Sequence, residues 1–445
     1  MESKVLDNVV DNFMSDSTDM RLSLKFGFLG LGMGGCSIAN ECAAITTKIT
    51  NNKYPYTAIL INTNLGDLEK LPNIPTARKV VLKGYEKGAG RKIEIGEKAF
   101  KDNIEQIRSH INEYFADREF VWVVCGLGGG TGTGSVLEAV RLLYQEGFAK
   151  RVGLILTLPR DNEGRTVLEN AIERLNTIAK AMKNLGSILL VDNEKLHQMF
   201  FNENQSRKDI EYLTLSNKFI AQTLHEINTV TASLPYGGYH FDSSELANML
   251  TTPGVLSFSR CELKEAETDA DRSASYLPEF KRSVQSGMLS DGHKLSSASR
   301  AAVSVIAKKS TAERVFTMDF VHGIEQALNE FVPLASEKPV ATYTVNEKDR
   351  SQSIRQIYIY SIFGGLQLPP RVTEIITKYQ SLVELEQSKE ADEVLAALSS
   401  FKIRKKEANN EVASGAVIDP FAVDEPEEEK KNINIPDNDP FADLD

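Results

Sequence analysis

Short apolar runs alternate with amphipathic stretches along the first half of this 445-residue chain. The apolar runs predict strands at 24–29, 58–61, 120–125, 152–158 and 187–191. Between them, apolar residues recur every three or four positions, which is the spacing of helices that bury one face. Strands that alternate with helices predict a doubly wound, parallel α/β sheet, whose ligand lies at the carboxyl ends of the strands.

The longest regular pattern runs from Ile210 to Thr231, where apolar or small residues follow one another at alternating steps of three and four. This spacing predicts one long helix with a buried stripe. A long charged helix is expected from Val372 to about Lys406, and a shorter one at residues 1–20. A second α+β unit is expected in between, with strands at 255–258, 340–345 and 356–362 and helices near Ala301–Ala307 and Phe320–Phe331.

Composition narrows the class of protein. The chain is 41% hydrophobic and 25% charged, as in ordinary globular proteins. No apolar run approaches the about twenty residues of a membrane span, and acids stand where a signal peptide would be basic, so we expect a cytoplasmic protein. Neither the four cysteines nor the six histidines show metal-site spacing, which predicts reduced packing thiols and no transition-metal site.

The net charge of −11 is concentrated at the carboxyl end, where residues 407–445 contain twelve acidic and two basic side chains. The rest of the chain is close to neutral, which argues against direct DNA binding, because phosphate contacts need a basic face. The acidic tail holds a near repeat, IDPFAVDE and NDPFADLD, centred on Phe421 and Phe441. Two interpretations stay open: a docking motif used twice, or a tail that only solubilises.

The main chemical signature is FVWVVCGLGGGTGTGS at residues 120–135. Glycines let consecutive backbone N–H groups converge on an anion, and Thr131 and Thr133 add hydroxyl donors. The helix expected next points its positive end at the same place, so the segment predicts a phosphate site. The alternative is a glycine-rich turn that only packs strand against helix.

Two further glycine-rich segments are expected to approach the same ligand. GLGMGG at 30–35 fits a dinucleotide fingerprint, so an NAD-dependent dehydrogenase is a rival hypothesis. That hypothesis requires an acid at the end of the second strand, where Asn62, Thr63 and Asn64 stand instead. The third segment, KGYEKGAGRKIEIG at 83–96, precedes an expected amphipathic helix through residues 100–114.

The string GGGTGTG resembles the GGGTG(S/T)G signature of the tubulin and FtsZ superfamily. The resemblance covers roughly residues 21–370 and involves four loops, which occur in the same order as in that superfamily. The third segment is similar to its GAGxxPxxG loop beside the terminal phosphate. Arg91 adds a cation to this loop, and Ile93 replaces the proline. The matching positions are Gly88, Ala89, Gly90, Glu94 and Gly96.

The resemblance also implies roles for isolated polar residues. Glu163 stands where the family has a ribose-contacting glutamate, whereas Val167 replaces an arginine. Asn193 and Asn217 would contact the guanine base, although Asn217 could also be a satisfied core asparagine. The residues expected to bind the nucleotide are Gly30, Leu31, Gly32, Met33, Gly34, Gly35, Asn62, Thr63, Asn64, Gly88, Ala89, Gly90, Arg91, Gly128, Gly129, Gly130, Thr131, Gly132, Thr133, Gly134, Glu163, Asn193 and Asn217.

Two acids after the long helix are the catalytic candidates. Asp242 and Glu245 match an N-x-D-x-x-D loop that, in FtsZ, completes the hydrolytic site of the neighbouring subunit, with His240 in place of the Asn. The local alternative is a helix N-cap with a capping box. The glycine loops offer no carboxylate, and a helix of this length places Asp242 about 30 Å from them, so a second subunit is expected to supply it.

The resemblance is closest to TubZ, the plasmid- or phage-borne branch that segregates DNA. It implies GTP/GDP and Mg²⁺ as cofactors and a head-to-tail filament of the chain with itself. It also implies a DNA-binding centromere adaptor held by the tail, so that DNA is engaged only indirectly and no membrane is involved. An FtsZ-like cell-division GTPase remains a second alternative.

The domain organisation that follows from these patterns has six segments. They are an N-terminal helix at 1–20, a GTP-binding domain at 21–209, a central helix at 210–235, a GTPase-activating or assembly domain at 236–370, a C-terminal helix at 371–406 and a disordered acidic tail at 407–445.

Overall fold

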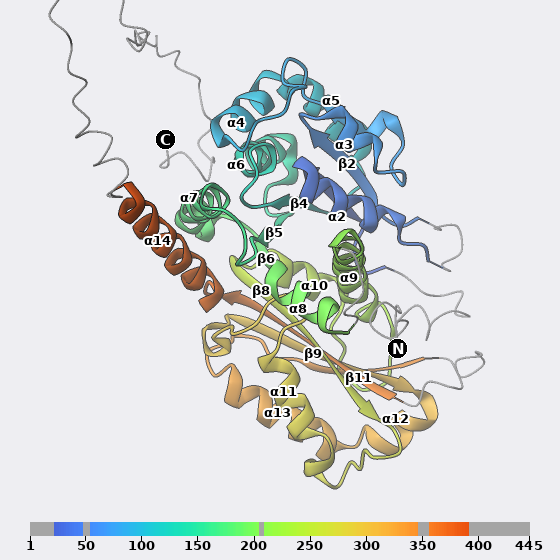
Figure 1. Ribbon diagram of the computed structural model, residues 1–445. Helices are drawn as coiled ribbons and strands as arrows, with labels where there is room; N and C mark the ends of the chain where they lie inside the picture. The colour runs from blue at the N-terminus through green and yellow to red at the C-terminus, as the bar shows by residue number, and fades with distance from the viewer. Residues whose placement is uncertain (1–21, 48–53, 204–208, 346–355, 391–445) are drawn as a thin grey trace, which may run out of the picture.

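The computed structural model of the chain describes residues 22–47, 54–203, 209–345 and 356–390 (Figure 1). The helix expected at 1–20, the end of the C-terminal helix and the tail with Phe421 and Phe441 lie outside the described residues.

Six parallel strands form the amino-terminal half of the sheet, in the order β3-β2-β1-β4-β5-β6. This order confirms the predicted doubly wound α/β fold. The strand order reverses between β1 and β4, and the crevice at such a switch point is where ligands bind in these folds. The strands are β1 (Phe26–Leu31), β2 (Thr57–Asn62), β3 (Lys79–Val81), β4 (Phe120–Gly126), β5 (Val152–Leu158) and β6 (Ser187–Asp192).

The second half of the chain extends the same sheet. β8 pairs in parallel with β6 through Ser187–Leu189 and Gly254–Leu256, and antiparallel pairing then joins β8 to β11 and β11 to β9. The described strands therefore make one eleven-stranded sheet rather than two. The added strands are β7 (Leu234–Pro235), β8 (Gly254–Lys264), β9 (Arg300–Lys308), β10 (Val340–Val345) and β11 (Gln356–Leu366).

A hydrophobic core lies on each face of this sheet. Alternate residues of β1 serve the two cores: Phe26 and Phe28 pack with α2, α8, α9 and α10, whereas Leu29 and Leu31 pack with α4, α5, α6 and α7. The helices are α2 (Gly32–Ala44), α3 (Leu65–Glu69), α4 (Ile93–Asp102), α5 (Ile104–Tyr114), α6 (Thr131–Leu143), α7 (Arg165–Ala181), α8 (Asn193–Glu203), α9 (Asp209–Val230), α10 (Ser243–Leu250), α11 (Leu277–Gln285), α12 (Lys309–Val315), α13 (Met318–Phe331) and α14 (Pro370–Glu390).

The long helix α9 is confirmed, and its buried polar groups tie it to both halves of the sheet. On one side, Asn228 accepts a hydrogen bond from the backbone N–H of Leu24 at 2.9 Å and donates to its carbonyl at 2.8 Å. On the other side, the buried Glu226 pairs with Arg260 of β8 at 2.9 Å. Because a buried charge left alone is costly, this pair fixes how α9 sits against the second unit.

Three expectations about secondary structure were wrong. The segment Ala301–Ala307 belongs to strand β9 and is not a helix. β9 pairs with β10 and β11, one on each side, and a strand that is buried on both faces of its sheet has a continuous apolar run. The helix expected through 100–114 is broken at Asn103, whose side chain bonds to the backbone of Lys83 and Ala99. The segment 30–35 is no loop, since β1 runs to Leu31 and α2 begins at Gly32.

Candidate functional site

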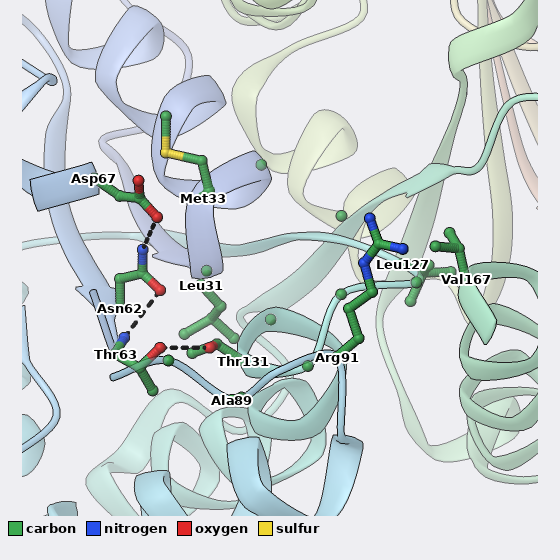
Figure 2. A pocket seen from close by; sticks show the side chains of 18 of the residues that line it. Leu31, Met33, Asn62, Thr63, Asp67, Ala89, Arg91, Leu127, Thr131 and Val167 are labelled. Carbon is green, nitrogen blue, oxygen red and sulfur yellow. Dashed lines mark hydrogen bonds between the residues drawn. The ribbon is translucent and has the colours of Figure 1, made fainter. Parts of the chain in front are cut away.

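A cleft of about 630 Å³ opens at the carboxyl ends of β1, β2 and β4, beside the switch point (Figure 2). It brings together the three glycine-rich segments and the ends of three further loops. The predicted residues that line it are Leu31, Gly32, Met33, Gly34, Asn62, Thr63, Asn64, Gly88, Ala89, Gly90, Arg91, Gly128, Gly129, Gly130, Thr131, Gly132, Glu163 and Asn193.

Two helix amino ends point into this cleft. α2 begins at Gly32 and α6 at Thr131, and no described side chain caps either helix. The first N–H groups of a helix have no partner within it, so those of α2 and α6 remain available to a ligand. Because each helix also carries a partial positive charge at this end, the geometry fits an anion such as a phosphate chain.

The two helix starts touch backbone to backbone. Gly32 has φ +63°, and a Cβ there would lie 2.8 Å from the backbone nitrogen of Gly132. A Cβ on Gly132 would lie 2.7 Å from the carbonyl oxygen of Leu31. Glycine at both positions is therefore required for the helix amino ends to converge on one site.

Apart from Asn217, four residues predicted to bind the ligand do not line the cleft: Gly30, Gly35, Thr133 and Gly134. Their position supports the alternative role of packing. A Cβ on Gly35 would meet the carbonyl oxygen of Val124 at 2.0 Å, and one on Gly134 would meet that of Ile93 at 2.3 Å. The Thr133 hydroxyl accepts a hydrogen bond from Gly128 N at 3.0 Å. These residues shape the cleft from behind.

The charged residues that line the cleft are Asp67, Arg91 and Glu163. Asp67 corrects the expectation that the cleft lacks a carboxylate of its own beside the glycine loops. It lies on the first turn of α3, where Asn62 Nδ2 approaches its Oδ2 at 3.4 Å. The Asn64 side chain accepts a hydrogen bond from Asp67 N and so caps the amino end of α3. The sequence pattern N-x-x-D is typical of such a helix cap, and it could have been used to predict that Asp67 lies beside the end of β2. Gly126, Leu127, Thr157 and Val167 are further lining residues that sequence reasoning did not identify as cleft-forming.

Hydroxyl groups cluster next to Asp67. The side chains of Thr63 and Thr131 hydrogen bond to each other at 2.9 Å, and Asn62 Oδ1 accepts from the backbone N–H of Thr63 at 2.9 Å. Figure 2 shows these groups on one side of the cleft, while the Arg91 side chain reaches toward Leu127 and Val167 on the other. At this end of the cleft, side-chain oxygen atoms therefore lie on one side and the Arg91 guanidinium lies on the other.

The opposite end of the cleft depends on the carboxyl-terminal helix. Arg371, on the first turn of α14, is 8% exposed and contacts Asp161 at 2.6 Å and Asp192 at 3.2 Å. These acids precede Glu163 and Asn193, respectively, so one guanidinium holds the two turns that carry them. Burial raises the pKa of Asp192, and Arg371 opposes that rise.

Asn217 lies apart from the lining residues. It is half-buried on α9 and is not among the residues of the cleft. The nearer part of α9 is Tyr212, whose hydroxyl donates to the carbonyl of Asn193 at 2.9 Å. The assignment of Asn217 to nucleotide binding remains a prediction.

The second candidate site is the carboxylate loop, residues 236–245, which follows α9. Asp242 caps α10: its Oδ1 accepts from Ser244 N at 2.8 Å and Glu245 N at 2.9 Å, and Glu245 Oε2 accepts from Asp242 N at 2.9 Å. The local alternative, a capping box, is thus present. Bonds from Ser244 and Glu245 hold the pKa of Asp242 below its usual range, so the carboxylate stays ionised near neutral pH. Neither acid lines the cleft.

The four cysteines are all buried and unpaired, and burial raises the pKa of Cys125 to about 12. They are therefore packing thiols, as predicted. No helix in the described part of the chain is long and apolar enough to cross a membrane.

Two family profiles match the chain. The GTPase domain of the tubulin/FtsZ family matches residues 26–201, and the C-terminal domain of the tubulin-like protein TubZ matches residues 239–370. Tubulin-like protein TubZ of Bacillus anthracis is 41% identical over 439 residues, which cover 95% of this chain and 99% of that protein. TubZ of Bacillus cereus is 43% identical over 413 residues, or 89% and 94% of the two chains.

Solved structures share the fold. A GTPγS-form protofilament of TubZ from Bacillus thuringiensis serovar israelensis superposes with a TM-score of 0.73 at 18% identity, covering 87% of this chain and 99% of that one. A two-stranded filament model of TubZ-Bt gives a TM-score of 0.75 at 20% identity, with coverage of 90% and 98%.

Proposed function

Since the chain belongs to the TubZ branch of the tubulin/FtsZ family of GTPases, we propose that it forms GTP-driven filaments that segregate plasmid or phage DNA through a DNA-binding adaptor. The observation that carries the GTP-dependent part is the convergence of the uncapped amino ends of α2 and α6 on one cleft. Family membership removes the ground for the NAD-dependent dehydrogenase hypothesis.

The phosphates of GTP would lie against α2 and α6, with the base and ribose toward Asn193 and Glu163. The groups around Asp67 fit Mg²⁺, because carboxylate and hydroxyl oxygens are the ligands this cation prefers. Asp67 and Thr131 are the residues that would hold it, directly or through water. When bound, the cation neutralises charge on the phosphates. Asn217, which lies on α9, stays in the proposal as a contact to the guanine base.

Hydrolysis would be completed between two copies of the chain. α9 has 22 residues, so it separates the cleft from the carboxylate loop by about 30 Å. Asp242 and Glu245 therefore need a neighbour's cleft to act on GTP. A head-to-tail contact that does not close on itself supplies that neighbour and generates a filament.

The surface around the carboxylate loop supports self-association. Tyr236, Tyr239 and Met318 are exposed, Met318 by 89%, and they line a hollow of about 520 Å³. An exposed apolar surface of this kind marks a site of contact with another protein molecule. The filament assemblies named for the structural neighbours are consistent with this face being buried in a polymer.

The proposal is tested by GTP turnover measured against protein concentration, together with sedimentation and negative-stain microscopy. Turnover per subunit should rise steeply where filaments form. Constant turnover per subunit, or absence of filaments with GTP, would argue against a filament-coupled GTPase.

The DNA-segregation part is tested separately through the acidic tail. Deleting residues 407–445 should leave filaments and GTP turnover intact but abolish capture of the adaptor, because those residues carry most of the net charge and both DPFA motifs. Equal capture by the shortened chain would contradict the tail assignment. An FtsZ-like division protein would instead require recruitment to the division site, which fluorescence microscopy in cells distinguishes from plasmid foci.

A further inference from the structure

Asn170, a buried side chain on α7, connects the two loops at the phosphate end of the cleft. It is 7% exposed. Its Nδ2 donates to the carbonyl oxygen of Arg91 at 2.8 Å and to that of Gly128 at 3.0 Å. Arg91 and Gly128 belong to different cleft-lining segments, so one amide fixes the separation between them.

The Arg91 backbone needs such a support. Its φ of +64° lies in the left-handed region, which is unfavourable for a residue with a side chain. Strained residues of this kind persist where surrounding contacts over-determine them, and they cluster at functional sites. The bond from Asn170 is one contact. A second is close packing of the loop on Gly130, where a Cβ would meet Ala89 Cβ at 2.8 Å and Lys92 N at 3.0 Å.

Arg91 is also the cation among the described residues that line the cleft, the other charged groups being Asp67 and Glu163. Its loop packs on the amino end of α6, where the phosphates are proposed to bind. Its side chain extends toward Leu127 and Val167 (Figure 2). Because Val167 lies on α7, the helix that also carries Asn170, the Arg91 loop and its side chain both face α7.

We propose that Asn170 is a positioning residue that sets Arg91 against the terminal phosphate, so that the cleft distinguishes GTP from GDP. The proposal rests on the GTPase function proposed above. Asn170 itself does not touch the nucleotide. It acts by holding the Arg91 carbonyl, and with it the strained loop, at a fixed distance from Gly128.

The test compares GTP and GDP affinity in three proteins by calorimetry, at concentrations where sedimentation shows no polymer. Asn170→Ala should weaken GTP binding about fivefold to tenfold, the scale of a lost hydrogen bond, and change GDP binding little. Asn170→Asp should be worse than Asn170→Ala, because a carboxylate would face two carbonyl oxygens. A role in packing alone predicts the reverse order, since Asp fills the space that Ala leaves empty.

Asn103→Ala is the matched control. Asn103 is also 7% exposed, and its amide bonds to Lys83 and Ala99 at the other end of the same loop, away from the cleft. This variant should lose thermal stability without changing the ratio of GTP to GDP affinity. An equal change of that ratio in Asn103→Ala would show that loop stability, not Arg91 placement, is responsible.

A double-mutant cycle with Arg91→Asn completes the test, since Asn tolerates the left-handed backbone but carries no charge. In that background Asn170→Ala should no longer alter the ratio. If Asn170→Ala fails to fold, Arg91→Asn alone must lose the GTP preference, and an unchanged ratio overturns the inference. Failure of the unmodified chain to bind GTP would instead refute the proposed function.

Discussion

The two ends of α9 carry different parts of the proposed chemistry. At its amino-terminal side lies the cleft, assembled from segments far apart in sequence, which touches α9 through the bond from Tyr212 to Asn193. Beyond its carboxyl end lies the carboxylate loop, whose Asp242 and Glu245 are held in a capping box by bonds among neighbouring residues. The cleft holds the groups for binding, whereas the loop holds the acid assigned to hydrolysis. One copy should therefore bind GTP alone but need a second copy to hydrolyse it efficiently.

The largest expected effect comes from the acid of the carboxylate loop. Asp242→Ala should bind GTP and form long-lived filaments, with turnover lower by about 10² to 10⁴, the scale of a missing base or water-positioning group. Steady-state phosphate release and nucleotide affinity check the two halves of this prediction. Weakened GTP binding in the unassembled protein would break the separation between the two ends.

Asp242→Asn sharpens the same comparison, because Asn remains a good N-cap for α10 but lacks the charge. If the acid acts in hydrolysis, both variants lose turnover. If it only caps the helix, Asp242→Asn retains turnover and only Asp242→Ala loses stability, by about 1 kcal/mol.

The next largest effect concerns the end of the cleft that is proposed to hold the guanine base, beside Glu163 and Asn193. Arg371→Ala removes the contacts of a buried guanidinium to Asp161 and Asp192 and should weaken GTP and GDP binding alike by about tenfold, because the turns that carry Glu163 and Asn193 lose their common anchor. Arg165→Ala is the control, since its pair with Glu386 also joins α14 to the first unit but is largely exposed. Equal losses in both variants would mean that docking of α14, not the anchor, is what matters.

A smaller effect is expected for Asn217→Ala, which should weaken GTP binding a few-fold and narrow the preference over ATP. The physical reason is that an amide offers guanine both a donor and an acceptor. Since Asn217 does not line the cleft as the structure stands, the prediction requires α9 to approach the bound base. Unchanged calorimetric affinities for both nucleotides would make Asn217 a helix residue without a binding role.

The smallest effect at neutral pH involves His293, which hydrogen bonds Ser290 at 2.7 Å in a loop that packs against Asp192 and Lys195. Burial lowers its pKa to about 4, so the folded protein holds it neutral. Its contribution is complete above the unfolded pKa of about 6.5 and is lost as pH falls toward 4, by up to about 3 kcal/mol.

Denaturant unfolding at pH 7 and pH 5 checks this. The unmodified chain should lose more stability on acidification than His293→Gln, which has no titrating group at this position. Asp242 should stay ionised over that range, because its pKa is lowered. Identical pH profiles for the two proteins would rule out His293 as the cause.

Local patterns were enough to predict the parts of the molecule that depend on neighbouring residues. Apolar runs predicted five of the six parallel strands, all but β3, and the spacing of Asp242 and Glu245 gave the capping box. Such features are set within a few residues, so the sequence shows them directly.

The rest depends on contacts between distant segments. Asn170 reads as one polar position on an amphipathic helix, and its role exists only because Arg91 and Gly128 fold against it. Arg371 is 179 and 210 positions from the acids it joins, Asp192 and Asp161. Likewise residues 301–307 were expected to form a helix, and their pairing with strands on both sides makes them part of β9.

The most direct test of catalysis between copies mixes two defective chains. Gly129→Trp should fill the cleft without moving the backbone, because Gly129 lines the cleft and a Cβ there meets nothing within 4 Å. Gly132 is unsuitable, since its Cβ would strike the carbonyl of Leu31 at 2.7 Å.

Asp242→Ala keeps a sound cleft and Gly129→Trp keeps a sound carboxylate loop, so each alone should be nearly inactive. After co-sedimentation confirms that the two assemble together, the mixture should release phosphate faster than the sum of the separate proteins. Proven co-assembly with no gain over that sum would mean that each chain completes its own hydrolytic site, contrary to this account.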